Sequence, residues 1–118
     1  MVTYMNDILS HLPLREPTFF IMVSLLPGPK HGYAILKQVE SLSKGRVKLS
    51  TGTLYGAIKR LLGRGWIRRV DDPIPNSTDR DRKSYDLTEL GQRVLNAEIA
   101  RLKNLVSVAR IQTAEEIL

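Results

Sequence analysis

Apolar residues recur at helical spacing in the first third of the chain and predict three helices. The first, over residues 5–12, is a short amphipathic helix that ends before Pro13. The second, over residues 18–26, is almost wholly apolar and is therefore predicted to be buried. The third, over residues 31–43, carries one apolar stripe, and the lysine and glycine that follow it are typical of a helix end.

The next segment predicts a very short strand followed by a capped helix. Residues 46–49 alternate polar and apolar side chains, which is typical of a strand. Ser50 or Thr51 then caps a helix that extends to about Gly63. At 100° per residue, the apolar residues of this helix share one arc and are predicted to be buried. They are Leu54, Ile58, Leu61 and Leu62.

The opposite face of this helix is small and basic. It carries Thr53, Gly56, Lys59 and Arg60. A glycine in mid-helix costs about 1 kcal/mol relative to alanine, and Gly56 is explained if the helix backbone must approach a groove closely. Tyr55 lies at the border of the two faces, where a packed ring and a phosphate-directed hydroxyl are both compatible with the pattern.

Two strands and a long helix complete the predicted order. Residues 66–70 and 83–87 alternate and are expected to pair antiparallel across a turn-rich loop, residues 71–81. Thr88 then caps the final helix. Three helices, a capped basic helix and a hairpin with a basic loop are the winged helix-turn-helix plan, a mainly α fold with a small β-hairpin (α+β). We assign residues 1–87 to this domain and residues 88–118 to a C-terminal dimerisation helix of the same compact domain.

The net charge of +6 is concentrated around the basic helix and the hairpin. Residues 44–83 carry eleven Lys or Arg against four Asp, a net charge of +7, so the rest of the chain has a net charge of −1. A basic segment of this kind is expected of a protein that binds the phosphate backbone of DNA. The alternatives are a basic face that only meets solvent and a winged-helix module that binds an acidic protein partner.

Several classes of protein are disfavoured. The chain has no cysteine, which excludes disulfides and thiolate metal sites, and no apolar run is long enough to cross a membrane. We therefore expect a cytoplasmic protein with no membrane partner. His11 and His31 lie far apart without a carboxylate cluster, so we expect no metal site. No catalytic constellation is evident, and we expect neither an enzyme nor a cofactor. Trp66 is predicted to be half-buried in the core rather than to bind a ligand.

Three segments resemble the PadR family of transcriptional regulators. They are LPGPKHGYAI at residues 26–35, LSTGTLY at residues 49–55 and RDRKSYDLTELG at residues 80–91. The similarity spans about residues 18–101 and departs from the family pattern at Gly56, where proline is frequent, and at Trp66, where a smaller apolar residue is common. The resemblance implies a homodimeric DNA-binding repressor with a pseudo-palindromic operator and a phenolic or other small hydrophobic effector.

The face assignments give a set of candidate DNA-binding residues. We expect the basic helix to enter the major groove, the hairpin to hold the adjacent minor groove or its phosphates, and the start of the preceding helix to brace the backbone. The candidates are Lys30, His31, Tyr33, Ser50, Thr51, Thr53, Tyr55, Gly56, Lys59, Arg60, Arg80, Arg82 and Lys83.

The final helix carries a coiled-coil-like apolar stripe at alternating spacings of four and three residues. Packing within the chain and pairing with a second copy both account for it, and the two combine in a two-fold dimer. The predicted dimerisation residues are Leu95, Ile99, Leu102, Val106 and Ala109. The predicted effector pocket at the same interface is lined by Ile8, Leu12, Leu102, Leu105 and Val106.

Overall fold

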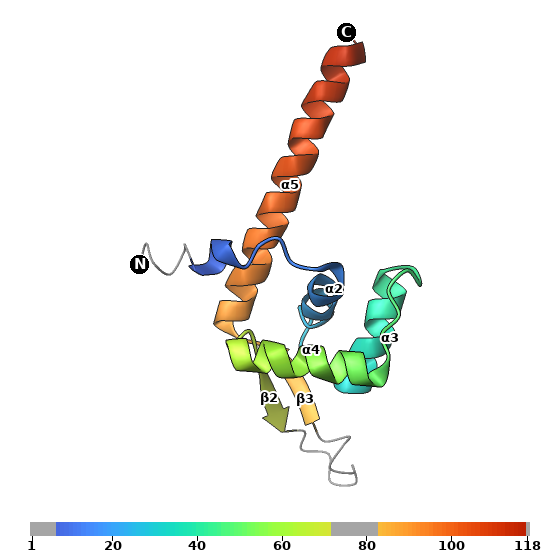
Figure 1. Cartoon of the computed structure of the whole chain (residues 1–118), viewed down its shortest axis with the longest axis vertical. Helices are drawn as coiled ribbons and strands as arrows, with labels where there is room; N and C mark the ends of the chain where they lie inside the picture. Colours follow the sequence, from blue (N-terminus) through green and yellow to red (C-terminus); the bar gives the residue numbers. More distant parts are fainter. Residues whose placement is uncertain (1–6, 72–82, 118) are drawn as a thin grey trace.

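The computed structural model describes residues 7–71 and 83–117, with side chains up to residue 114, and confirms a mainly helical winged helix-turn-helix fold (Figure 1). Residues 7–10 are helical. The labelled elements that follow are α2 (Glu16–Ser24), β1 (Lys30–His31), α3 (Gly32–Leu42), α4 (Thr51–Arg64), β2 (Ile67–Asp71), β3 (Lys83–Leu87) and α5 (Glu89–Ile117).

The sheet has three antiparallel strands in the order β1-β3-β2. Strand β3 has the predicted bounds and pairs with β2 from Lys83 opposite Asp71 to Leu87 opposite Ile67. The third strand is not the predicted one: residues 46–49 form no strand, and β1 pairs with β3 instead. The Val47 N–H donates to the Ser43 hydroxyl at 2.9 Å, so a side chain and not a neighbouring strand satisfies this backbone.

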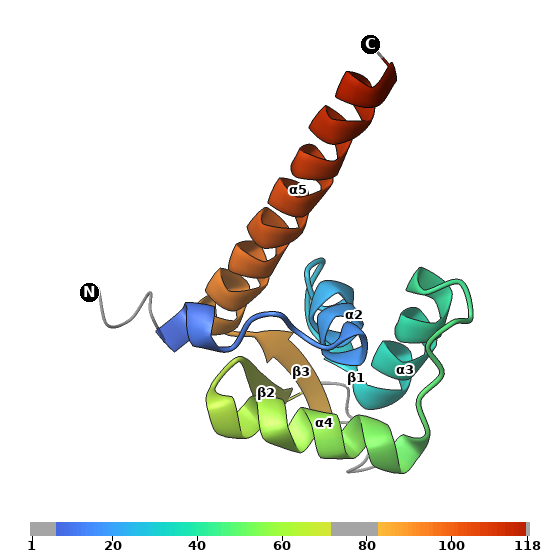
Figure 2. The same cartoon turned by 45° about the horizontal axis from the view of Figure 1, so that its top comes forward.

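The core lies where the helices meet the sheet. Helix α2 lies between α3 and α5 and contacts both, and α4 runs beneath them against the hairpin (Figure 2). The Trp66 side chain is 2% exposed, so its predicted place in the core is confirmed and its burial is greater than expected. The fully buried large apolar side chains are Ile21, Met22, Leu25, Ile35, Val39, Leu54, Ile58, Ile67, Val94 and Leu95.

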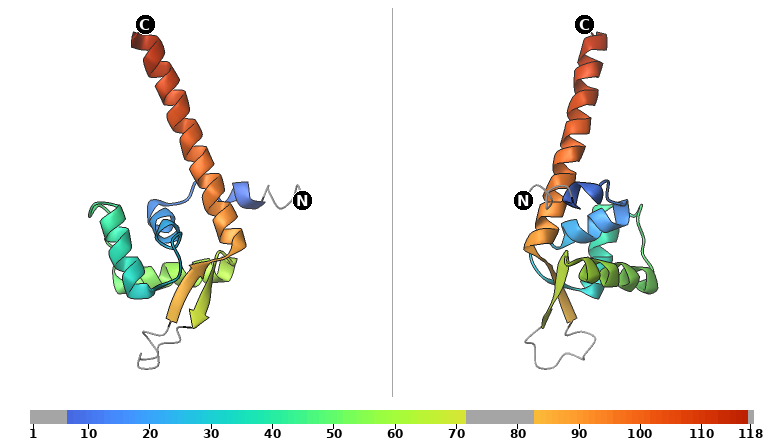
Figure 3. Two further views of the ribbon diagram at one scale, coloured as in Figure 1. Left: turned by 180° about the vertical axis from the view of Figure 1, so that it is seen from behind. Right: turned by 60° about the vertical axis from the view of Figure 1, so that its left-hand side comes forward.

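Helix α5 has two different halves. Near its start, Val94, Leu95 and Glu98 are buried against the rest of the domain. From Leu102 to residue 114 every side chain is exposed, and this half extends well beyond the other elements (Figure 3). The domain thus leaves about half of its longest helix without a cover from its own chain.

Candidate nucleic-acid interface

Helix α4 begins and ends where the sequence predicts. Ser50 is the N-cap residue, and its hydroxyl oxygen accepts a hydrogen bond from the Thr53 N–H at 3.1 Å. The same hydroxyl donates to Thr53 Oγ1 at 2.9 Å. The helix ends at Gly65, whose φ of +74° is a left-handed conformation that glycine adopts without steric cost. These two caps set where α4 begins and ends.

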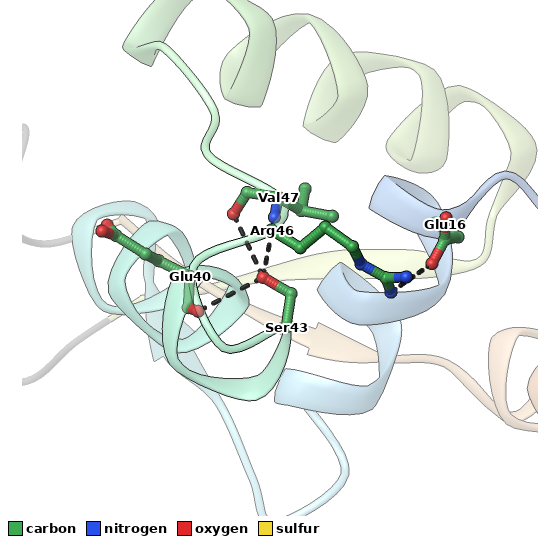
Figure 4. A network of polar contacts seen from close by, with 5 residues as sticks. All are labelled: Glu16, Glu40, Ser43, Arg46 and Val47. Atoms are coloured by element: carbon green, nitrogen blue, oxygen red, sulfur yellow. Dashed lines mark hydrogen bonds and ion pairs between the residues drawn. The ribbon is translucent and has the colours of Figure 1, made fainter.

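The turn that leads into α4 is organised around Ser43 (Figure 4). The Ser43 hydroxyl lies 3.2 Å from the Glu40 carbonyl oxygen and accepts the Val47 N–H, so it joins the end of α3 to the segment before α4. Beside it, Arg46 forms an ion pair with Glu16 at the start of α2. Both groups of that pair are largely exposed, so it contributes little to stability.

The two faces of α4 are confirmed. Leu54, Ala57, Ile58 and Leu61 are buried, and Leu62 is half-buried. Thr51, Thr53, Lys59 and Arg60 are exposed. A methyl group at Gly56 would contact only the Arg60 guanidinium, at 3.7 Å, so packing within the domain does not require glycine there.

Tyr55 packs against the start of α3. A Cβ atom at Gly32 would overlap the Tyr55 hydroxyl and ring, so the tyrosine occupies the space that only a glycine leaves open. The Tyr55 side chain is half-buried, and it borders a hollow of about 290 Å³ that Tyr33 and Thr51 also line. The packed ring of the sequence prediction is therefore observed, and its hydroxyl lies next to the first residue of α3.

His31 and Tyr33 border this hollow, and Lys30 precedes them in β1. His31 precedes α3 and is half-buried, with Nδ1 3.5 Å from the Ser84 hydroxyl of β3. Lys30 is half-buried in β1 opposite Tyr85. Tyr33 is 68% exposed, and the Lys37 ammonium lies 5.5 Å from the centre of its ring.

On the hairpin, the structure adds two basic residues that the sequence prediction missed. Arg68 and Arg69 are exposed on β2, and Arg68 lies 3.8 Å from the Asp86 carboxylate. Their signal in the sequence was the net positive charge of residues 44–83. The alternation of the strand did not predict that two consecutive residues, Arg68 and Arg69, would both face solvent. Lys83 is exposed at the start of β3, whereas Arg80 and Arg82 lie outside the described residues.

Tyr85 lies on β3 of the hairpin. Its side chain is 4% exposed, and burial raises the pKa of its hydroxyl; the nearby Tyr55 raises this pKa further and Arg69 opposes the rise. Tyr85 therefore belongs to the core and not to the exposed surface of the hairpin.

The predicted dimerisation stripe requires one correction. Leu95 is fully buried in the core of its own chain, so its side chain is not available to a partner. Ile99 is half-buried, and Leu102, Val106 and Ala109 are exposed. Together with Phe19 of α2, the exposed leucine and valine line a shallow apolar groove along α5.

The predicted effector residues are not brought together within one chain. Ile8 is 3% exposed and borders a hollow beside Trp66, whereas Leu102 and Val106 line the groove on α5. Leu12 is half-buried, and Leu105 is exposed. The sequence pattern identified apolar residues on two helices, but periodicity does not show that Ile8 turns into the core.

The described residues include neither a cluster of metal-ligating side chains nor a helix suited to cross a membrane. Within residues 7–71 and 83–117, no three His, Cys, Asp or Glu residues are grouped so as to hold a metal ion. In the same ranges, no helix combines the length and the apolar character that a membrane span requires.

Comparison with known proteins identifies one family. The model of the transcriptional regulator PadR-like family matches residues 21–97. A curated relative, an uncharacterized 37.1 kDa protein in a transposon of Streptomyces fradiae, is 33% identical in an alignment over 95 residues that covers 78% of this chain. The chain spans about a quarter of the length of that protein.

Solved structures show the same fold. A PadR family transcription regulator from Clostridium difficile has a TM-score of 0.68 and 23% identity, over 84% of this chain and 99% of that one. A PadR-like transcription factor from Bacteroides fragilis has a TM-score of 0.64 and 25% identity, over 79% and 85%. Bacillus subtilis PadR in complex with operator DNA has a TM-score of 0.62 and 23% identity, over 74% and 47%.

Proposed function

This chain belongs to the PadR-like family of transcriptional regulators, and from that premise we propose that it is a homodimeric repressor that binds a pseudo-palindromic operator. The single observation that carries the DNA-binding part is the exposed face of α4. A helix capped at both ends buries its apolar side and leaves Thr51, Thr53, Lys59 and Arg60 in solvent. Bacillus subtilis PadR, which has a similar fold, has been solved in complex with operator DNA, and this supports DNA as the partner.

The hairpin extends this surface. Helix α4 and strands β2 and β3 lie at the end of the molecule opposite the free end of α5 (Figure 1). Arg68, Arg69 and Lys83 are exposed on these strands, so a duplex along α4 meets positive charge on the hairpin as well. In this proposal α4 reads bases in the major groove and the hairpin holds phosphates beside it.

The dimer is proposed from the uncovered half of α5. Leu102 is 36% exposed, Val106 49% and Ile111 58%, and they follow one another along the groove. Full burial of side chains of this size contributes about 1.5–3 kcal/mol each, so a second copy of the same surface is the natural cover. A two-fold pair places the two α4 helices on half-sites about 34 Å apart or a multiple of that.

We also propose that a small hydrophobic or phenolic effector binds between the paired α5 helices. The apolar groove around Leu102 and Val106 suits such a molecule, whereas the buried Ile8 does not contribute to it. Binding there would change how the two copies pair and hence how the two α4 helices meet DNA.

Fluorescence anisotropy tests the proposal directly. The purified protein is titrated into labelled duplex from upstream of its own gene and into a scrambled duplex, each at two salt concentrations. We expect tighter, salt-sensitive binding to the upstream duplex, with two copies bound per duplex. Equal and weak binding to both duplexes that is lost with salt would contradict sequence-specific regulation. The winged-helix module that binds an acidic protein would then be the better account of the basic surface.

A further inference from the structure

The start of α5 is fastened to the end of α4 by four residues, which we call the joint: Gly65, Trp66, Thr88 and Gly91. The Thr88 hydroxyl donates to the Gly65 carbonyl at 2.5 Å and accepts the Gly91 N–H at 3.0 Å. The Thr88 N–H donates to the Trp66 carbonyl at 3.0 Å. One threonine therefore caps α5, as the sequence predicts, and also links it to the residue that ends α4.

Gly91 makes the same connection by close packing. A Cβ atom there would overlap the carbonyl group and Cα of Trp66, which is backbone and cannot move aside as a side-chain tip can. The Gly91 conformation itself is helical, so the absence of a side chain serves this approach and not an unusual backbone angle. The first turn of α5 thus lies directly on the backbone that connects α4 to β2.

The length of α5 amplifies any change at the joint. The helix has 29 residues, so at about 1.5 Å per residue it is about 43 Å long. A tilt of about 5° at its start moves its far end by about 4 Å, which is close to the rise of one base pair, about 3.4 Å. The exposed apolar half, where we place the second copy, is the half that moves most.

We infer that the joint is a positioning device that fixes the angle between α4 and α5 and thereby selects the spacing of the two operator half-sites. Thr88 and Gly91 touch no DNA in this arrangement and act through the helices that they hold together. The inferred effect on half-site spacing rests on the proposed dimeric DNA binding. The inferred effect on the angle between α4 and α5 concerns a single chain and does not depend on that proposal.

Spin labels measure the angle without DNA. The chain has no cysteine, so Lys59→Cys on α4 and Asn104→Cys on α5 place two labels selectively on exposed positions. Dilution with unlabelled protein restricts the measured distance to labels within one chain. We expect a narrow distance distribution for the parent chain and a shifted or broadened one for Gly91→Ala. The matched control is Gln92→Ala, at the exposed neighbouring position, which should change nothing.

An unchanged distribution in a folded Gly91→Ala chain would overturn the inference. If that variant does not fold, Thr88→Val decides, because it removes the hydroxyl bonds to Gly65 and Gly91 and keeps the size of the side chain. Thr88→Ser retains the hydroxyl and should restore the parent distribution. A Thr88→Val chain with the same distance distribution as the parent would also overturn the inference that the joint fixes the angle.

Selection from a pool of random duplexes tests the spacing. The parent chain should enrich an inverted repeat with one preferred spacing, and the variant with the altered angle should enrich the same half-site at a different or less defined spacing. The same spacing for both would overturn the link between joint and operator. If the parent chain enriches no inverted repeat, the proposed dimeric function fails, and the spin-label distances still decide whether the joint sets the angle.

Discussion

At the scale of single residues, neighbouring side chains of α4 have separate roles. Lys59 is exposed on the proposed DNA face. Lys59→Ala should weaken binding to all duplexes alike and lower the salt slope of the binding constant by about 1, because one phosphate contact is lost. Anisotropy titrations across a salt series measure this slope. Arg15→Ala, which removes one exposed positive charge at the start of α2, away from α4, the hairpin and the groove on α5, is the matched control and should leave the slope unchanged.

Ile58 precedes Lys59 in the chain and faces the opposite way. Its side chain is 1% exposed in the core, so Ile58→Ala should lower the free energy of unfolding by about 2–5 kcal/mol through lost burial and an unfilled cavity. Urea unfolding followed by circular dichroism gives this number. A stability loss at Lys59→Ala as large as that at Ile58→Ala would show that the two faces of α4 are wrongly assigned.

At the scale of elements, a buried carboxylate ties the segment before α2 to α5. Glu98 on α5 is 2% exposed, pairs with Arg101 through two hydrogen bonds and accepts the Leu14 N–H at 2.8 Å. The hydrogen bond from Arg101 lowers the pKa of Glu98 below its ordinary value, with help from the Leu14 N–H and the charge of Arg101, although burial opposes the shift.

This pKa shift predicts an acid-dependent loss of stability. A carboxylate with a lower pKa in the folded state stabilises the fold above the pKa of the unfolded chain, and this contribution is lost as the pH falls through the folded value. The free energy of unfolding should therefore fall below about pH 4.5, the ordinary glutamate value. Glu98→Gln should be less stable at neutral pH and should lose part of this acid dependence. Urea unfolding at several pH values compares the two chains, and parallel pH profiles would contradict the assignment.

The sequence predicted helices and strands well where the segment was long enough for a periodic pattern to repeat. The faces of α4 follow from its 3.6-residue period, and β3 was predicted residue for residue. Strand β1 has two residues, too few for any alternation, so only the fold reveals that it pairs with β3. Leu95 belongs to a regular apolar stripe, but the stripe does not show whether its own chain or a second copy covers each residue. Leu95 is buried by its own chain.

Sequence patterns did not predict the contacts between distant segments. Thr88 was predicted as a cap from its own neighbourhood, yet its second partner, Gly65, lies 23 residues away. Gly32 and Tyr55 both belong to segments that resemble the family, and only the fold shows that the glycine makes room for the ring. These residues are recognisable in the sequence, while the reason for their identity is a tertiary contact.

At the scale of the whole molecule, the two ends of the chain's longest axis have opposite chemistry. One end presents the basic faces of α4 and the hairpin, and the other presents the apolar half of α5 (Figure 1). In the proposed dimer, operator binding requires both ends, because paired α5 helices would bring two modest half-site affinities onto one duplex. Loss of pairing should therefore reduce DNA affinity without any change in the DNA-binding face.

Val106→Glu tests this coupling. The side chain is 49% exposed in the groove on α5, so a charge is tolerated in the single chain but opposes burial against a second copy. We expect sedimentation equilibrium to show a monomer with an unchanged circular dichroism spectrum, and affinity for a full operator to fall to that of a single half-site. Asn104→Glu adds the same charge two residues away, on the other side of the helix; it should remain dimeric. A Val106→Glu chain that stays dimeric would place the second copy on a different surface, because a buried, unpaired carboxylate at the interface would prevent pairing.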